Sequence, residues 1–473
     1  MQSQGSSDTD GETRPAGMYR LEDEGDVDVG GDRRERYLSV LDSTLAYARR
    51  RDYVGPDYGD GLSSRLLQAL PIDNRWLNLA VQETVKRSPV DVRPIFRVEE
   101  RRNYKGAALF TMANLNYYDL VGDGTETDPS LAAFDPLLEA DRLADWLIEE
   151  RITDYSGFCG GHRHPIQHLH TKGVPSDPDI VSTAYAVRAL LEVARFAGRE
   201  DVDLDPETRE KYASHAELAR TAVDFLVEDL NYREVDDGAK IDYHMNHPDD
   251  SYTINAAALG ASMLVDLYDY FGDDDLRERA TKILDHVAAC QTDRGGWPYR
   301  LPADASHLSM DNHHNGFVVE SFQRYRDIVG DDRYEETLED ALEFYRDELF
   351  ALDGAPNFDE ENDYPRDIHA STQGMLVFAR EGELELAERI LRWTLANLQV
   401  EGEQGRFYYR KYRHHTKRVT LMRWCQGWMS YATSEFLLAC ARRDRDPERP
   451  LDAEPAGGDR EIDRREAAPT PET

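Results

Sequence analysis

The sequence predicts an all-α protein, an (α/α)6 toroid of helical hairpins with disordered acidic tails. Three observations lead to this fold class. Helical periodicity of apolar residues runs through the chain from about residue 34 to 443, and strand-like alternation is nearly absent. Short turns alternate with long loops, as expected when hairpins are joined in series. The helices that follow the long loops all begin with small residues, which allow the close packing that an inner ring needs.

Apolar periodicity and stop signals place each helix in order. We expect helices at 36–51, 104–121, 136–150, 178–198, 210–229, 253–271, 275–290, 312–329, 333–350, 367–381, 383–399 and 422–442, with an additional amphipathic helix near 74–87. Residues 1–33 and 444–473 are rich in Asp, Glu, Gly, Pro and Arg and poor in large apolar residues, so both are predicted to be disordered tails. One toroidal catalytic domain, residues 34–443, lies between them.

The hairpins are marked by short turns at 272–274, 330–332 and 381–382. Six hairpins close into a ring if the last inner helix, 422–442, packs against 36–51. An open superhelix of the same hairpins is the alternative, but it would need capping repeats, and the sequence contains none.

The charge of the chain restricts its partners. The formal net charge is -37, from 93 Asp and Glu against 56 Lys and Arg, and only eight of the basic residues are Lys. Such a composition suits a cytoplasm at molar salt, although an acidic protein of an ordinary cytoplasm is the alternative. Nucleic acid and anionic lipid are disfavoured as partners, because both are bound through clustered Lys and Arg.

Other sequence features point to a cytoplasmic protein without a membrane span. No apolar run approaches the length of about 18 residues that a spanning helix needs, and the N-terminus has no signal-peptide pattern. The four cysteines are scattered and form no CxxC pair, so they indicate neither a disulfide framework nor a zinc site.

Histidines are concentrated in the long loops and in the first helical turns after them. If every long loop leads from an outer to an inner helix, all of these loops lie at one end of the ring. Twelve of the 14 histidines fall in these segments, which are 152–177, 230–252, 291–314, 351–369 and 400–421. We therefore predict a functional face there. The alternative is that polar loops simply tolerate histidine.

The same segments combine aromatic and basic residues, a combination that suits a carbohydrate ligand. The expected substrate-binding residues are Trp297, Tyr299, His313, Arg410, Arg423, Trp424 and Gln426. Several have structural alternatives: Trp297 and Trp424 could be core residues, and Arg423 could pair with a loop carboxylate. Asp311 and Asp367 could be helix N-caps.

No metal or cofactor is predicted. The alternating histidines His162, His164, His168 and His170 could bind a metal, but such spacing on a loop is a weak signal. No GxGxxG motif joins a strand to a helix, so a bound nicotinamide is not expected.

Two resemblances add to this interpretation. Residues 291–297, QTDRGGW, are similar to a single QW repeat of terpene cyclases and protein prenyltransferases, but the DxDD cyclisation motif is missing. More of the chain resembles the six-hairpin proteins of polysaccharide-biosynthesis clusters and, given its composition, those of the haloarchaeal N-glycosylation pathway. The segments that carry this resemblance are 88–94, 310–317, 367–371, 407–412 and 422–429.

The second resemblance implies a sugar isomerase or epimerase. Its substrate would be a hexuronic acid, linked to a nucleotide or to dolichol phosphate, in the N-glycan of the surface-layer glycoprotein. Epimerisation at C5 requires two proton carriers on opposite faces of the sugar and a cation that stabilises the enolate-like state. We assign His314, His369 and Tyr409 as candidate proton carriers, with Asp311 or Asp367 orienting a histidine, and Arg410 and Arg423 as carboxylate partners.

Two rival functions remain open. A glycoside hydrolase or lyase on the same toroid could use Asp311 and Asp367 as its carboxyl pair, which would have to lie about 5 to 9.5 Å apart. A non-catalytic protein that binds a glycan or lipid carrier is the other alternative. The sequence does not predict the oligomeric state.

Overall fold

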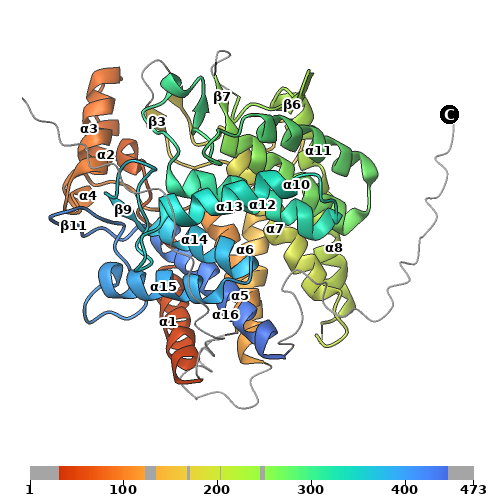
Figure 1. Ribbon diagram of the computed structural model, residues 1–473. Helices are drawn as coiled ribbons and strands as arrows, with labels where there is room; N and C mark the ends of the chain where they lie inside the picture. The colour runs from red at the N-terminus through yellow and green to blue at the C-terminus, as the bar shows by residue number, and fades with distance from the viewer. Residues whose placement is uncertain (1–30, 123–134, 168–170, 203, 246–250, 446–473) are drawn as a thin grey trace, which may run out of the picture.

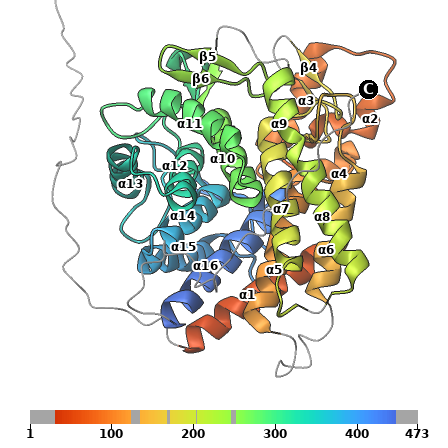
Figure 2. The ribbon, with the colours of Figure 1, turned by 90° about the vertical axis from the view of Figure 1, so that its right-hand side faces the viewer.

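The computed structural model describes residues 31–122, 135–167, 171–202, 204–245 and 251–445. Within them, six inner helices form a ring in which each packs on the next and the last packs on the first (Figures 1 and 2). They are α5 (Tyr104–Val121), α7 (Ile180–Ala197), α10 (Ile254–Phe271), α12 (Asn312–Val329), α14 (Ile368–Arg380) and α16 (Trp428–Arg445). The contact between α16 and α5 closes the ring, so the predicted toroid is confirmed and the open superhelix is excluded.

Each inner helix has an outer partner, and the first outer helix packs on α16 as predicted. The outer helices are α1 (Gly31–Arg49), α6 (Pro136–Glu149), α8 (Pro206–Arg220), α11 (Asp274–Ala289), α13 (Glu335–Leu349) and α15 (Leu384–Leu398). Their sequences bury one stripe only; in α6 it consists of Ala140, Leu143, Ala144 and Leu147. The inner helices are enclosed on more sides, and α5 is buried continuously over 104–115.

Capping residues fix where the inner helices begin and end. The side chains of Asn103, Asp179, Asp311 and Asp367 accept backbone N–H groups at the starts of α5, α7, α12 and α14. Gly330 ends α12 at a φ of 69°, a left-handed conformation that favours glycine, and the chain then turns into α13. The inner helices begin at the same end of the ring, where Lys105 of α5 lies close to Phe317 of α12 and Trp428 of α16.

Two predicted helices differ in detail from the structure. The single helix expected at 210–229 is divided into three elements. α8 ends at Arg220, and the chain then passes through α9 (Ala222–Asp224) and the π-helical η3 (Phe225–Asp229). The helix expected at 422–442 starts with a π-helical turn, η5 (Met422–Gly427). Periodicity does not separate such turns from an α-helix. Helical residues also extend slightly beyond 34–443, whereas most of both predicted tails lies outside the described residues.

Residues 60–96 form a small helical lobe beside the ring. It contains η1 (Asp60–Ser63), α2 (Arg65–Gln68), α3 (Arg75–Arg87) and α4 (Arg93–Phe96). The sequence predicts α3 but not the shorter helices. Three further short elements lie elsewhere: η4 (Ala303–Ala305) before α12, and the paired strands β1 (Val54–Gly55) and β2 (Arg101–Arg102).

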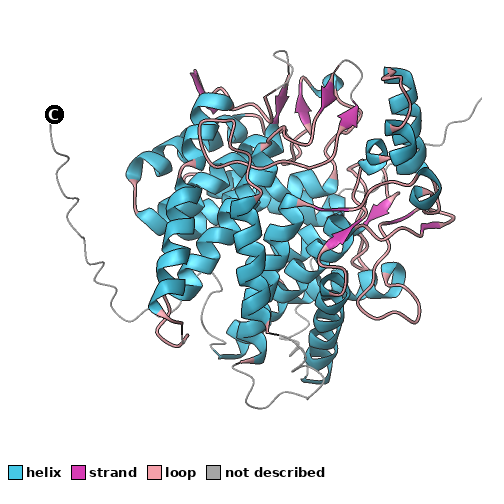
Figure 3. Ribbon diagram, turned by 180° about the vertical axis from the view of Figure 1, so that it is seen from behind, coloured by secondary structure: helices cyan, strands magenta, loops and turns pink. Residues whose placement is uncertain are grey.

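Short antiparallel strands lie at the end of the ring where the inner helices begin (Figure 3). Two or three residues are too few to produce a visible alternation in the sequence. The pairs are β3 (Ile166–Gln167) with β4 (Lys172–Gly173), β5 (Arg233–Val235) with β6 (Gly238–Lys240), and β7 (Tyr252–Thr253) with β8 (Arg300–Leu301). A three-stranded sheet joins β9 (Arg366–Asp367), β10 (Arg410–Lys411) and β11 (Thr416–Lys417).

Side chains fill the interior of the ring. Halfway along the helices, Arg188 of α7 binds both Asp266 of α10, at 2.9 Å, and Glu320 of α12, at 2.9 Å. Arg324 of α12 also binds Asp266. Nearer the helix starts lie the aromatic rings of Tyr185 and Trp428, which are 5.3 Å apart. The two ends of the ring are thus separated by packed side chains. Among the described helices, none is long and apolar enough to cross a membrane.

Candidate active site

Three histidines meet where α12 and α14 begin, and we call them the histidine cluster. His313 and His314 lie in the first turn of α12, and His369 lies in the first turn of α14. The ring of His313 is 3.9 Å from that of His314 and 4.6 Å from that of His369. Trp424 of η5 packs edge-on against His369 at 4.6 Å, and the half-buried Tyr299 lies 4.4 Å from His314. The fold thus brings together residues that the sequence analysis predicted to be catalytic or substrate-binding and that lie in separate segments of the chain.

Asp311 caps α12 and orients two of the histidines. Its carboxylate lies 2.8 Å from Nδ1 of His314 and 3.3 Å from Nδ1 of His313. Because an ionised carboxylate can only accept, Nδ1 of His314 carries a proton, and Nε2 is an acceptor in the neutral imidazole and a donor in the imidazolium. Burial alone would raise the pKa of Asp311, but His314 and His313 hold it below its usual range. Asp311 is therefore both the helix cap and the residue that orients the histidines.

The same three residues have the donor types of a metal site. One ligand atom from each of Asp311, His313 and His314 lies within 4.8 Å of the others. The carboxylate of Asp311, however, accepts a hydrogen bond from Nδ1 of His314 at 2.8 Å, and Nδ1 of His313 lies within ion-pair distance of it at 3.3 Å. The described side chains account for these contacts by themselves.

His369 is the most deeply buried member of the cluster. Its side chain lies between the rings of Trp424 and Trp428, with centroids 4.6 and 4.5 Å away. Neither ring nitrogen has a hydrogen-bond partner within the described part of the chain. Burial, together with His313 and Lys105, lowers the pKa of His369 well below its usual value, so the imidazole is neutral at pH 7. Unsatisfied buried polar groups are rare in folded proteins and often mark functional positions.

Lys105 lies beneath this cluster, although no sequence motif marks it. It is in the first turn of α5 and is buried, with Nζ 5.4 Å from the ring of Trp428 and 5.6 Å from that of Phe317. Burial and the neighbouring Arg423 lower its pKa to about 7. A lysine within the mostly apolar run 104–113 is the signal that could have found it, because buried lysines are rare and often functional.

A second anchor joins the start of α14 to the sheet. The register of β9 and β10 places Arg410 opposite Asp367, and their side chains are 2.6 Å apart. Asp367 also caps α14 through the N–H of His369, at 2.8 Å, and accepts a hydrogen bond from the indole of Trp424, at 3.1 Å. Tyr409 is buried beside them, and its hydroxyl has no partner among the described residues. Burial raises the pKa of Tyr409 well above its usual value.

Arg423 is fixed by a buried carboxylate, as one of the sequence alternatives proposed. Its guanidinium lies 2.9 Å from Asp57, which also accepts a hydrogen bond from Asn103 at 2.7 Å. Burial would raise the pKa of Asp57, but Arg423 holds it below its usual range. The neighbouring Tyr58 stacks on Trp424 at 5.0 Å. Asp57 and Tyr58 belong to no motif in the sequence, so only the fold identifies them.

Two predicted substrate-binding residues have structural roles instead. The indole of Trp297 donates to the carbonyl of Val287 at 2.8 Å and stacks on Phe322, so Trp297 is a core residue. Gln426 is fully buried: its amide donates to the carbonyl of Gly405 and accepts from the N–H of Phe407. Side-chain direction decides both cases, and the sequence does not encode it in a visible pattern.

The histidine-rich loop before α7 does not form one site in the described residues. Nε2 of His162 lies 3.9 Å from Asp179, whereas His164 contacts Ser63 at 3.0 Å. These two histidines therefore have different partners. His168 and His170 lie outside the described residues.

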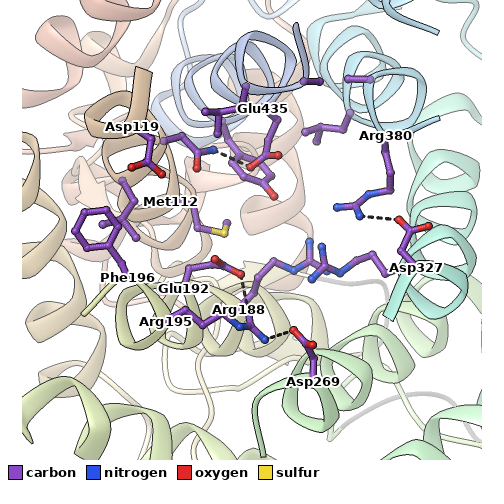
Figure 4. A pocket seen from close by; sticks show the side chains of 18 of the residues that line it. Met112, Asp119, Arg188, Glu192, Arg195, Phe196, Asp269, Asp327, Arg380 and Glu435 are labelled. Atoms are coloured by element: carbon purple, nitrogen blue, oxygen red, sulfur yellow. Dashed lines mark hydrogen bonds and ion pairs between the residues drawn. The ribbon is translucent and has the colours of Figure 1, made fainter. Parts of the chain in front are cut away.

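A cavity of about 690 Å³ lies at the opposite end of the ring, where the inner helices end (Figure 4). Several of its charged side chains are paired: Arg195 with Glu192 on the same helix and with Asp269 on α10, and Arg380 of α14 with Asp327 of α12. Arginine is suited to this end because helix C-termini attract cations. Among the described residues that line this cavity there is no histidine, cysteine or lysine. The predicted catalytic histidines His314 and His369 lie at the other end of the ring.

Comparison with known proteins identifies the fold. No protein-family model matches the chain, and no curated protein matches its sequence. Among solved structures, a sugar epimerase from a ruminal bacterium is similar at a TM-score of 0.52 with 15% identity, over 72% of this chain and 90% of that one. Cellobiose 2-epimerase from Bacillus thermoamylovorans is similar at a TM-score of 0.54 with 15% identity, over 72% and 90% of the two chains.

A third similar structure has a different activity in its name. An unsaturated glucuronyl hydrolase specific for heparin matches at a TM-score of 0.54 with 12% identity, over 88% of this chain and 99% of that one. At such identities the likeness concerns the fold. The chain therefore shares the toroidal fold found in these sugar epimerases and in this hydrolase.

Proposed function

We propose that this protein is a sugar isomerase or epimerase acting on a hexuronic acid, or on its carrier-linked form, in N-glycan biosynthesis for a surface-layer glycoprotein. The observation that carries the proposal is the histidine cluster. Three imidazoles lie in contact at the starts of two inner helices, with Lys105 and Arg423 nearby.

Epimerisation at C5 requires a base that is neutral before it accepts the proton. In the proposed reaction, the imidazole of His369 removes the C5 proton, and the C–H electrons move into the adjacent carboxylate to give an enediolate. The low pKa of His369 keeps it in the neutral form that can act as a base at pH 7. The imidazolium of His314 then returns a proton to C5 from the other face. Asp311 stabilises that imidazolium through Nδ1.

The negative charge that develops on the enediolate needs fixed cations. Lys105 and Arg423 are rigidly placed: one is enclosed by aromatic rings and the other is held by Asp57. The inner-helix N-termini also point towards this end and add positive partial charge. Preorganised charges of this kind stabilise a transition state without reorganisation. Arg410 is the second candidate partner for the sugar carboxylate.

The fold comparison supports a sugar-processing enzyme, since two similar structures are sugar epimerases. Because one similar structure is a glucuronyl hydrolase, a glycoside hydrolase or lyase is the second candidate function. The general acid of a glycoside hydrolase needs a raised pKa. Asp311, however, has a lowered pKa, and Asp367 is bound by Arg410, His369 and Trp424. These contacts favour epimerisation.

Two measurements test the proposal. Mass spectrometry of the surface glycan in a deletion strain should find a truncated or altered hexuronate; an unchanged glycan would remove the pathway assignment. Purified protein incubated with the hexuronate-containing glycan in deuterated water should introduce deuterium at C5. Release of free sugar without deuterium would favour the hydrolase. Binding with neither result would favour a non-catalytic glycan-binding protein.

A further inference from the structure

One lobe of the molecule differs in both charge and polarity from the rest of its surface. We define the basic lobe as residues 64–98 together with the hairpin 405–418. The two segments are joined by a bridge between Val90 and Arg418, and the N–H of Arg418 donates to the carbonyl of Pro89 at 3.2 Å. α3, α4 and β11 lie together at one edge of the molecule (Figure 1).

Large apolar side chains of the basic lobe are left uncovered. Residues with exposed apolar side chains include Ile95 at 71% exposure, Trp76 at 63% and Ile72 at 59%. Leu66, Leu70 and Val90 are also exposed. Six of the ten exposed large apolar residues of the described chain therefore fall between residues 66 and 95. Single exposed apolar residues are ordinary, but such a concentration marks an interaction surface.

The charge of the basic lobe is opposite to that of the whole chain. Its two segments contain twelve Lys and Arg against three Asp and Glu, and the hairpin 405–418 contains no acidic residue. Arg413 and Arg418 are exposed on the hairpin, and Arg97 is exposed on the helical part; Arg87, also exposed, pairs with Glu83 at 2.6 Å. The net charge of -37, which disfavours anionic partners for the chain as a whole, thus conceals a local cationic face.

We propose that the basic lobe docks on an anionic lipid surface. Such a surface offers phosphates to the exposed arginines and an acyl boundary to Trp76, Ile72 and Ile95. The acidic remainder of the molecule is repelled by the same surface, so only this face can approach it. Docking also orients the protein, because the lobe lies at the same end of the ring as the histidine cluster.

The lobe is connected directly to the candidate active site. The hairpin 405–418 contains Arg410, which binds Asp367, and Tyr409, whose ring faces Nζ of Lys417 at 5.6 Å. If the proposed function holds, a docked molecule presents its histidine cluster to a sugar attached to a lipid phosphate. The docking itself does not depend on the reaction, and binding can be measured without turnover.

The full chain should be tested by flotation with phosphatidylcholine vesicles, with and without phosphatidylglycerol. We expect at least tenfold more bound protein on the phosphatidylglycerol vesicles at low salt, with less binding as salt rises. The triple variant Ile72→Ser, Trp76→Ser, Ile95→Ser should bind the phosphatidylglycerol vesicles at least tenfold less than the unaltered chain. The matched variant Leu138→Ser, Leu352→Ser replaces exposed apolar residues outside the lobe and should bind as the unaltered chain does.

Charge reversal tests the electrostatic contribution to lipid binding. Arg413→Glu with Arg418→Glu should lower binding to anionic vesicles about tenfold, whereas Arg277→Glu, which replaces an exposed residue of α11, should not. Circular dichroism should confirm that every variant is folded. Equal binding to both kinds of vesicle, or none to either, would overturn the proposal. A lobe variant that changes only the mass in light scattering would instead identify a contact between two copies of the chain.

Discussion

The imidazole of His313 stacks on that of His369, with ring centroids 4.6 Å apart and planes inclined by 27°. The two residues are far apart in the sequence and belong to different hairpins. Their contact exists because α12 and α14 are neighbours in the ring and both begin at the same end. Burial lowers the pKa of both histidines well below the usual value, and His313 lowers that of His369 further, so both imidazoles are neutral at pH 7.

Replacing His369 should abolish turnover while leaving the fold intact. His369→Gln keeps a polar side chain but cannot take the C5 proton, so deuterium exchange at C5 should fall by about 10² to 10⁴. His286→Gln is the matched control, because His286 is also buried but lies on the outer helix α11, where it contacts Asp237 of the turn between β5 and β6 at 2.7 Å. Equal activity in both variants would remove His369 from the mechanism.

Asp311→Ser separates capping from catalysis. Serine is as good an N-cap as aspartate, so the free energy of unfolding should change by less than about 1 kcal/mol. The carboxylate that holds His314 is lost, so the rate of deuterium exchange should fall by about tenfold to a hundredfold. Asp273→Ser, at the N-cap of α11, provides the comparison and should retain full activity. A large loss of stability with unchanged kcat would instead identify Asp311 as a cap alone.

The free energy of unfolding should depend on pH in the neutral to alkaline range because of Lys105. Its pKa is lowered from 10.5 to about 7 by burial and by Arg423. Between these values the unfolded chain binds a proton that the folded chain does not, so stability rises with pH across this window, by about 5 kcal/mol in total and by about 3 kcal/mol up to pH 9. Lys105→Met should lose this rise and should be more stable than the unaltered chain at pH 6. Urea unfolding at pH 6 and 9 measures the difference, with Lys282→Met as an exposed control.

The activity profile tests the same residue independently of stability. If protonated Lys105 stabilises the enediolate, kcat should fall above pH 7 as the amine loses its proton. Lys105→Arg should extend activity to higher pH, because a guanidinium stays charged. An unchanged alkaline limb in the Arg variant would show that Lys105 is not the group that titrates.

Asp266 should control acid stability from the middle of the ring. Burial raises its pKa, but Arg324 and Arg188 reverse this and lower it to about 2. Since the folded pKa lies below the unfolded value of about 3.9, the carboxylate contributes about 2 to 3 kcal/mol above pH 4 and loses it as pH falls towards 2. Asp266→Asn should cost about 3 to 5 kcal/mol at pH 7, because two buried arginines lose their counter-charge. In this variant the free energy of unfolding should also change less between pH 4 and pH 2 than it does in the unaltered chain.

Asp269→Asn provides the comparison for this variant. Asp269 lies on the same helix, but it is partly exposed and pairs with Arg195 at the surface of the cavity. Its replacement should cost less than about 1 kcal/mol. Unfolding by urea at pH 7 and 3 measures both variants. Similar costs for Asp266 and Asp269 would contradict a dominant role for the buried ion pairs.

Local sequence signals determined the fold class of this protein. Apolar periodicity, the glycines that end α10 and α12, and the polar caps at the helix starts depend on interactions between residues close in the chain. The concentration of histidines at one end of the ring follows from the same signals, because the order of helices and long loops assigns each loop to an end. Asp311 and Asp367 also have the positions of helix caps in the sequence itself.

The tertiary structure decided which of these residues act together. Trp297 and Gln426 resemble ligand contacts in sequence, but their side chains turn inwards and bond to backbone groups. Lys105 and Asp57 belong to no motif, yet ring closure places them beside His369 and Arg423. The basic lobe is hidden in the same way, since Val90 and Arg418 meet only in the fold. Periodicity records which face of a helix is buried, whereas a site depends on directions and distances between segments that only the packed ring fixes.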